Sequence, residues 1–167
     1  MKKLKKFQFL LILTTFIFSI NGFGQNEIIP FKNSGVIFSA DYEYYSFNNL
    51  KRFTPSFSEI SELEKLLSRN IKGINRNRPN QGHQPLIHRN LKKYKRQYIG
   101  YFDDKGERVI YVKFLWKGYQ YFDNNGKEIE IWKTQWLEIF DGGSSYWQIK
   151  YKPDLKIFSD LAVNGVS

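Results

Sequence analysis

The sequence predicts an α+β fold in which one N-terminal amphipathic helix packs on a four- or five-stranded antiparallel sheet. An apolar pattern with the period of a helix follows residue 54, and patterns with a period of two recur from residue 94 to the C-terminus. Aromatic side chains make up 18% of the chain, and they suit the pleated, half-buried surface of a sheet. These observations together predict one helix that is covered by a sheet formed mainly from the C-terminal half.

The first 24 residues predict a secretory signal peptide. Lysines open the chain, an uncharged run extends from Phe7 to Ile20, and Gly22 and Gly24 provide the small residues of a cleavage site. This run of 14 residues is shorter than the roughly 20 that a membrane-spanning helix needs, so we expect cleavage and no transmembrane anchor. Cleavage removes four lysines and lowers the formal charge from +10 to +6. We therefore expect an exported protein of the periplasm or the cell exterior.

No cysteine occurs anywhere in the chain. Its absence excludes a lipid-modified cysteine, a disulfide scaffold, a thiol nucleophile and a zinc site built on thiolates. The chain beyond Gly24 has a normal length for one domain with its own core. We predict an N-terminal tail over residues 25–52, in which the pattern permits a short strand from Val36 to Phe47, and a single domain over residues 53–167.

A helix is predicted to start just after residue 54. Thr54 and Pro55 suit its first positions, and Ser56 together with Glu59 fits a capping box. Apolar residues then recur at steps of three and four, which is the period of one helical face. These residues are Phe57, Ile60, Leu63, Leu67 and Ile71. A loop rich in Gly, Asn and Pro follows from residue 73 and ends the helix.

A first hairpin is predicted over residues 94–102 and 107–116. Its connection contains Gly106, which can supply the positive φ that a tight turn needs. The second segment is apolar on both faces except at Lys113, so we expect it in the middle of the sheet. Residues 121–126 repeat the pattern of this connection, which indicates the same turn used twice rather than a solenoid.

A second hairpin is predicted over residues 130–140 and 145–151. Glycines in the connection favour a turn, and a last strand is expected over residues 155–163. In the segment 145–151, large apolar side chains alternate with polar ones. This alternation predicts that one face of the sheet meets the helix and the other meets water.

Four short motifs give the chain a resemblance to a set of known proteins. The motifs are Thr54-Pro55, Arg96-Gln97-Tyr98, Asp141-Gly142-Gly143 and Val163-Asn164-Gly165. Through them, residues 53–167 look like small uncharacterised exported bacterial proteins. The resemblance implies export and a single domain, and it carries over no activity and no functional residue.

Side chains with catalytic or ligand-binding chemistry form no recognisable catalytic, metal or nucleotide site. His83 and His88 lie in a cationic segment without a nearby acid, which does not suit a metal ion. The spacings of glycines and acids fit neither an EF-hand nor a phosphate-binding loop. Glu59 and Glu62 share a helix face, but acids are ordinary in a first helical turn. The sequence therefore favours a protein without enzyme activity, and we expect no metal, nucleotide or other cofactor.

Charge is distributed unevenly along the chain. Between Lys65 and Phe102 there are ten Lys and Arg residues and no acid, so the rest of the chain beyond Gly24, which is +6 overall, carries −4. Tyrosines interleave with these cations, as they do in sites for sugars, bases or phosphates. We predict a binding surface formed by Arg89, Lys92, Lys93, Tyr94, Lys95, Arg96 and Tyr98. The alternative is that these cations only solvate a loop and complement the C-terminal end of the helix.

Three functions are compatible with this pattern. The first is an exported binding domain for an anionic glycan, lipopolysaccharide or an acidic protein. The second is an inhibitor or immunity-type protein that caps an exported enzyme, and the third is a hydrolase of extracellular polymer. Because successive residues of a strand alternate faces, a binding surface can use Lys93 with Lys95, or Lys92 with Arg96, but not both pairs.

Overall fold

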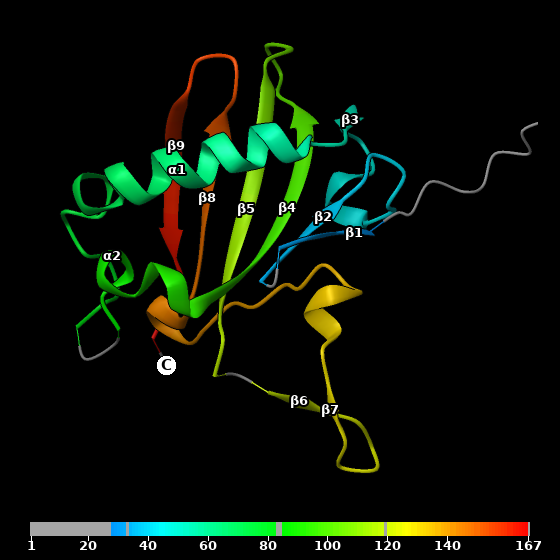
Figure 1. Cartoon of the computed structure of the whole chain (residues 1–167), viewed down its shortest axis with the longest axis vertical. Helices are drawn as coiled ribbons and strands as arrows, with labels where there is room; N and C mark the ends of the chain where they lie inside the picture. Colours follow the sequence, from blue (N-terminus) through cyan, green and yellow to red (C-terminus); the bar gives the residue numbers. More distant parts are fainter. Residues whose placement is uncertain (1–27, 33, 83–84, 119, 167) are drawn as a thin grey trace, which may run out of the picture.

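A computed structural model describes residues 28–32, 34–82, 85–118 and 120–166. The predicted signal peptide and its cleavage site lie outside these residues. The fold is α+β, as the sequence predicted. Helix α1 (Phe57–Ile74) lies across one face of a seven-stranded sheet (Figure 1).

The sheet is mixed, whereas the sequence predicted four or five antiparallel strands. Its order is β1-β2-β4-β5-β8-β9, and β3 pairs with β4 beyond the end of β2. All neighbours are antiparallel except β2 and β4, which are parallel. The strands are β1 (Ile28–Phe31), β2 (Gly35–Phe38), β3 (Arg52–Phe53), β4 (Tyr94–Phe102), β5 (Arg108–Trp116), β8 (Tyr146–Lys152) and β9 (Ile157–Val163).

The segment predicted as an N-terminal tail forms one edge of this sheet. β1 and β2 make an antiparallel hairpin, and β2 then pairs with Arg96–Ile99 of β4. The strand that the pattern permitted from Val36 to Phe47 is limited to Gly35–Phe38. Parallel pairing between segments so distant in the chain leaves no local pattern by which it could be predicted.

Helix α1 begins where the sequence predicted. Ser56 is its N-cap: the Ser56 side chain accepts a hydrogen bond from the backbone N–H of Glu59, and the Glu59 carboxylate accepts one from the Ser56 N–H. Phe57 is an exception to the predicted apolar face, because it is 54% exposed in the first turn. The remaining residues of the predicted face are buried, namely Ile60, Leu63, Leu67 and Ile71.

No described helix has the length and apolarity that a membrane span requires.

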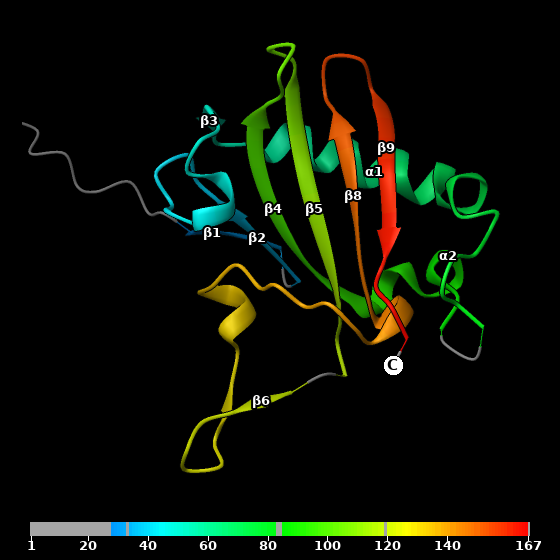
Figure 2. The same ribbon diagram turned by 180° about the vertical axis from the view of Figure 1, so that it is seen from behind.

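Apolar side chains form one cluster on each face of the sheet. The cluster under α1 includes Trp147, Ile149 and Tyr151 of β8 together with the buried helix residues. Gln148 and Lys150 are partly exposed on the opposite face, so the predicted alternation in this strand is confirmed. The prediction that this opposite face meets water is wrong, because a second apolar cluster covers much of it. Side chains from the segments before β3 and before β8 close the second cluster, on the face that Figure 2 shows.

The strand predicted over residues 130–140 is wrong. The 3-10 turn η3 (Ile131–Lys133) and an extended segment occupy this region, and β5 pairs with β8 instead. Trp132 and Trp136 are buried against the second cluster. Gln97 of β4 anchors the segment by donating hydrogen bonds to two of its backbone carbonyls at 2.8 and 2.6 Å. The apolar residues of this segment therefore cover the sheet rather than extend it.

The repeated turn that the sequence indicated is confirmed. Asp103 and Asp123 each accept, through Oδ1, hydrogen bonds from the backbone N–H groups two and four residues further on, at 2.9 to 3.0 Å. The glycine three residues after each aspartate has φ of 75° or 76°. The second copy joins β6 (Tyr121–Phe122) to β7 (Glu128–Ile129), a short hairpin that projects away from the sheet (Figures 1 and 2).

Candidate functional site

Strand β4 divides the predicted binding surface. Tyr94, Arg96 and Tyr98 face α1 and are only 0%, 7% and 0% exposed, so they are not available to a large ligand. Lys95 lies on the other face, with its Nζ 5.3 Å from the centre of the Trp132 ring. The seven predicted residues therefore do not form one surface, because three of them belong to the interior.

The other three predicted residues are exposed. Arg89 lies in α2 (Ile87–Asn90), and Lys92 and Lys93 lie in the 3-10 turn η2 (Leu91–Lys93), which leads into β4. Lys93 extends over the ring of Trp116, with Nζ 5.7 Å from its centre. Lys92 instead lines a pocket together with Arg96. Because Lys92 and Lys93 lie in η2 and not in β4, the predicted alternation of strand faces does not apply to them, and Lys93 and Lys95 contact rings of opposite clusters.

Arg96 and Tyr98 share the carboxylate of Glu64, which comes from α1. Arg96 Nε and Tyr98 Oη both donate to Glu64 Oε1, at 3.1 and 2.9 Å. Arg96 also donates to the carbonyls of Leu91, at 2.9 Å, and Tyr94. Burial raises the pKa of Tyr98 well above its ordinary value, and the neighbouring Glu64 raises it further. These contacts join α1 to β4, so the residues that make them hold the fold together.

A pocket of about 210 Å³ opens beside this network. Its charged residues are three cations and one carboxylate, so an anion is favoured there over a cation. Lys32 from the β1–β2 turn is one of the cations, and the sequence analysis missed it because it lies far along the chain from Lys92. The full lining is Phe31, Lys32, Ser34, Gly35, Glu64, Lys92, Arg96 and Tyr98.

Exposed cations gather at one end of the molecule. The part of α1 from Lys65 onward leads into the loop after it, and this loop, α2 and η2 lie close together near the end of β9 (Figures 1 and 2). Within the described part of the chain, no ion pair joins the exposed cations of these elements to an acid. We call these eight residues the basic end: Lys65, Arg69, Lys72, Arg76, Arg78, Arg89, Lys92 and Lys93.

The carboxylates of α1 do not neutralise the basic end, because they form ion pairs with cations of other elements. Each of the three carboxylates on this helix contacts a cation of the sheet or of a turn, at 2.6 to 3.1 Å. The pairs are Glu59 with Arg108, Glu62 with Lys156, and Glu64 with Arg96. The cations on the second half of the helix are therefore left without a carboxylate partner on their own element.

Buried amides fix the loop that carries part of the basic end. Asn75 and Gln81 are buried, and each side chain donates a hydrogen bond to the other, at 2.9 and 2.6 Å. Gln81 Oε1 also accepts from the backbone N–H of Ile87 at 3.1 Å. Asn80 donates to two backbone carbonyls at the end of β9, at 3.0 and 3.1 Å. These hydrogen bonds hold the segment that carries Arg76 and Arg78 in place, which lowers the entropy cost of binding a ligand.

Three cations of the basic end act on the pKa of His88. Burial lowers the pKa of His88, and the positive charges of Arg78, Arg89 and Lys72 lower it further. These cations come from the loop, from α2 and from the last turn of α1, so the fold gathers charges that are separate in the sequence. All three cations lie in the acid-free run that the sequence analysis identified. Of the three, the predicted binding surface included only Arg89.

The acids that the sequence offered for catalysis have structural partners. Partial burial acts to raise the pKa of Glu59, but hydrogen bonds from Ser56 and Arg108 outweigh it and leave the pKa below its ordinary value. Glu59 is therefore an ionised helix cap rather than a proton donor, and Glu62 is paired with Lys156. Across the described residues, no three His, Asp or Glu side chains are grouped so that they could hold a metal ion.

No protein-family model, no curated protein and no solved structure matches this chain. The function must therefore be argued from the charges and contacts described above.

Proposed function

We propose that this chain is an exported, non-enzymatic binding domain whose basic end binds a polyanion. The observation that carries the proposal is the set of eight exposed cations with no acidic partner among the described residues. Polymers with closely spaced sulfate, carboxylate or phosphate groups match this charge, and an anionic glycan or lipopolysaccharide is the ligand we favour. The predicted signal peptide supports a location in the periplasm or outside the cell.

Two features of the basic end favour a polymer over a single small anion. The cations extend over α1, a loop, α2 and η2, so the anionic groups that face them must also be spread over a distance. The pocket beside Glu64 adds Lys32 and Lys92, which can flank one anionic group of such a polymer. Affinity of this kind comes largely from counterions that the polymer releases, so it depends strongly on salt.

Removing the three cations around His88 is expected to weaken polyanion binding and to make it less sensitive to salt. The variant carries Lys72→Gln, Arg89→Gln and Arg78→Asn, because residue 78 has φ of 48°, which asparagine tolerates. If all three cations contact the polymer, the slope of log K against log salt should become shallower by about 2 to 3. Fluorescence anisotropy with labelled heparin and with lipopolysaccharide, at several salt concentrations, measures this slope.

A control variant removes the same amount of charge from another part of the surface. It carries Lys51→Gln, Lys105→Gln and Lys127→Gln, three exposed lysines outside the basic end. Its salt slope should match that of the wild type, and circular dichroism should show that both variants are folded. Equal losses in the two variants would mean that net charge alone drives binding. A wild type that binds neither polymer at low salt would refute the proposal.

Polyanion affinity is expected to rise as the pH falls from about 7 to about 5. Because burial and three cations lower the pKa of His88, its imidazole is neutral at pH 7 and gains a proton only in more acidic solution. Without ligand this titration reduces stability below the unfolded-state pKa of about 6.5, since the unfolded chain takes up the proton more readily. A bound polyanion favours the proton instead. His88→Gln should remove most of the rise, and an unchanged rise would exclude His88 as its source.

A protein partner is the second candidate, and the projecting β6–β7 hairpin supports it. Phe122 on this hairpin is 58% exposed, and the hairpin extends away from the sheet (Figure 1). An inhibitor or immunity-type protein that caps an exported enzyme could place this hairpin or the basic end in an acidic cleft. This candidate gains support if the wild type binds no polyanion at low salt.

A further inference from the structure

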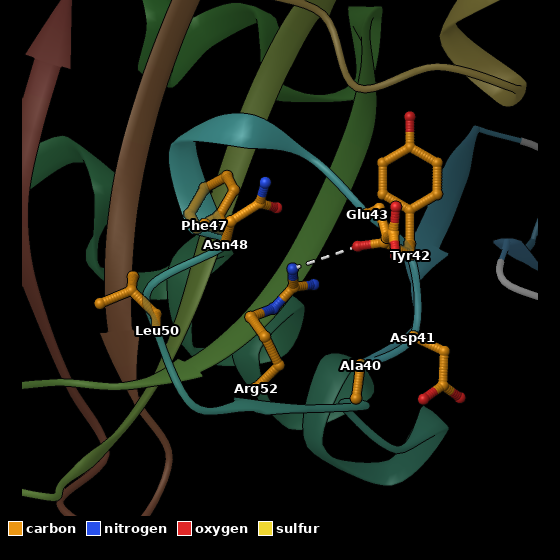
Figure 3. A pocket seen from close by; sticks show the side chains of 8 residues that line it. All are labelled: Ala40, Asp41, Tyr42, Glu43, Phe47, Asn48, Leu50 and Arg52. Carbon is orange, nitrogen blue, oxygen red and sulfur yellow. Dashed lines mark hydrogen bonds between the residues drawn. The ribbon is translucent and has the colours of Figure 1, made fainter.

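A separate cavity lies between the loop after β2 and strand β3 (Figure 3). Its volume is about 480 Å³, which falls within the range of small-molecule sites. None of its residues belongs to the basic end, so the cavity is independent of the proposed polyanion site. The lining consists of Ala40, Asp41, Tyr42, Glu43, Phe47, Asn48, Leu50 and Arg52.

Arg52 brings an unpaired positive charge to this cavity. Its Nε donates to the carbonyl of Gly100 at 2.9 Å, and its terminal N–H groups donate to the carbonyls of Ser39 and Tyr42 at 3.1 and 3.5 Å. The guanidinium carbon lies 5.3 Å from the centre of the Phe47 ring. In the described part of the chain, no carboxylate forms an ion pair with Arg52. Burial lowers the pKa of Arg52.

The carbonyls orient the guanidinium without neutralising it. They occupy three of the five N–H groups that an arginine offers, so two donors have no hydrogen-bond partner among the described residues. A partly buried charge without a counterion is costly, and an anion placed against Arg52 would relieve that cost. A planar guanidinium held in one orientation is suited to a carboxylate, which can accept two hydrogen bonds from it.

Two carboxylates line the same cavity without contacting Arg52. Asp41 and Glu43 are exposed, and they lie on the opposite side of Arg52 from Leu50 in Figure 3. Neither forms an ion pair with Arg52 or with another described cation. Leu50 is partly exposed and adds apolar surface to the lining, whereas Phe47 is only 7% exposed beneath the guanidinium of Arg52. The cavity thus presents charges of both signs that are kept apart and flanked by apolar side chains.

We propose that this cavity binds a zwitterion that carries a carboxylate, a primary ammonium group and an apolar side chain. The carboxylate contacts Arg52, the ammonium group contacts Glu43 or Asp41, and the apolar side chain packs on Leu50. Charge-assisted hydrogen bonds at both ends select this arrangement over a ligand with only one charge. A free α-amino acid and a dipeptide share this chemistry, and they differ in the distance between their charged groups.

The first test varies the ligand and leaves the protein unchanged. Calorimetric titrations use L-leucine, leucyl-leucine, leucinamide, which lacks the carboxylate, and N-acetyl-leucine, which lacks the ammonium group. Leucine or leucyl-leucine should bind at least about tenfold more tightly than either single-charge analogue, which corresponds to about 1.4 kcal/mol. The zwitterion that binds more tightly shows whether the cavity prefers a free amino acid or a dipeptide. Equal affinities for all four compounds, or no binding of either zwitterion at about 20 mM, would overturn the proposal.

The second test removes the carboxylates and keeps the hydrogen bonds that hold Arg52. A double variant with Asp41→Asn and Glu43→Gln should bind leucine and leucinamide about tenfold more weakly, and it should bind N-acetyl-leucine at least as well as the wild type. The control carries Asp104→Asn and Asp141→Asn, two exposed acids outside the cavity. It should bind leucine as the wild type does. Equal losses in the two double variants would refute a specific role for Asp41 and Glu43.

Discussion

Replacing Leu67 with alanine is expected to lower the free energy of unfolding by about 2 to 5 kcal/mol. Leu67 is 0% exposed and packs in the apolar cluster between α1 and the sheet. The loss combines the transfer free energy of the removed carbon atoms with the cost of a cavity that the sheet cannot fully close. Urea unfolding followed by circular dichroism measures the difference.

Leu155→Ala is the matched control for this substitution. Leu155 is 55% exposed in the connection between β8 and β9, so the same chemical change removes little buried surface. Its effect should stay within about 0.5 kcal/mol, the usual range for surface positions. A comparably small effect of Leu67→Ala would mean that α1 does not pack on the sheet.

Arg96→Met is expected to destabilise the protein by about 3 to 5 kcal/mol. The side chains of Arg96 and Glu64 are 9% and 19% exposed, so the substitution leaves a largely buried carboxylate without its cation. Two backbone carbonyls also lose the hydrogen bonds that Arg96 donates. Methionine keeps much of the apolar stem, which limits the loss of packing. The same unfolding experiment measures the change.

A second substitution tests whether the unpaired charge of Glu64 causes the loss of stability in Arg96→Met. Adding Glu64→Gln to Arg96→Met removes the uncompensated charge and retains an acceptor for Tyr98, so part of the stability should return. Lys156→Met serves as the control, because the side chains of Lys156 and Glu62 are 60% and 41% exposed and such pairs contribute less than about 1 kcal/mol. If Arg96→Met costs no more than this control, Arg96 is not a structural residue and again becomes a candidate for ligand binding.

Arg96 and Tyr98 illustrate why the candidate site could not be completed from the sequence. An acid-free run of cations and tyrosines suggests an exposed surface, and nothing nearby in the chain indicates otherwise. The carboxylate that holds Arg96 is 32 residues away, on another element. Burial of a charge depends on such a partner, so it became visible only when α1 and β4 were placed together.

For the basic end, by contrast, the sequence did indicate which residues take part. Its cations could be identified from the acid-free run, because the net charge of a segment is a property of the sequence. Their joint effect on the pKa of His88 depends on where the fold places the residues after α1, and the hydrogen-bonded pair Asn75 and Gln81 fixes part of that segment. The cavity at Arg52 had no sequence signal, because its residues are ordinary loop residues until β3 pairs with β4.

By itself, the sequence determined the features that depend on residues a few positions apart. The capping box at Ser56, the repeated aspartate turn and the alternation in β8 are of this kind, because hydrogen bonds and side-chain direction act within four residues. The tertiary structure alone decided that β2 pairs in parallel with β4 and that residues 131–139 cover the sheet instead of joining it. An apolar segment can be buried either by pairing at a sheet edge or by packing on a sheet face. Which of the two it adopts depends on distant residues that complete the pairing or the packing.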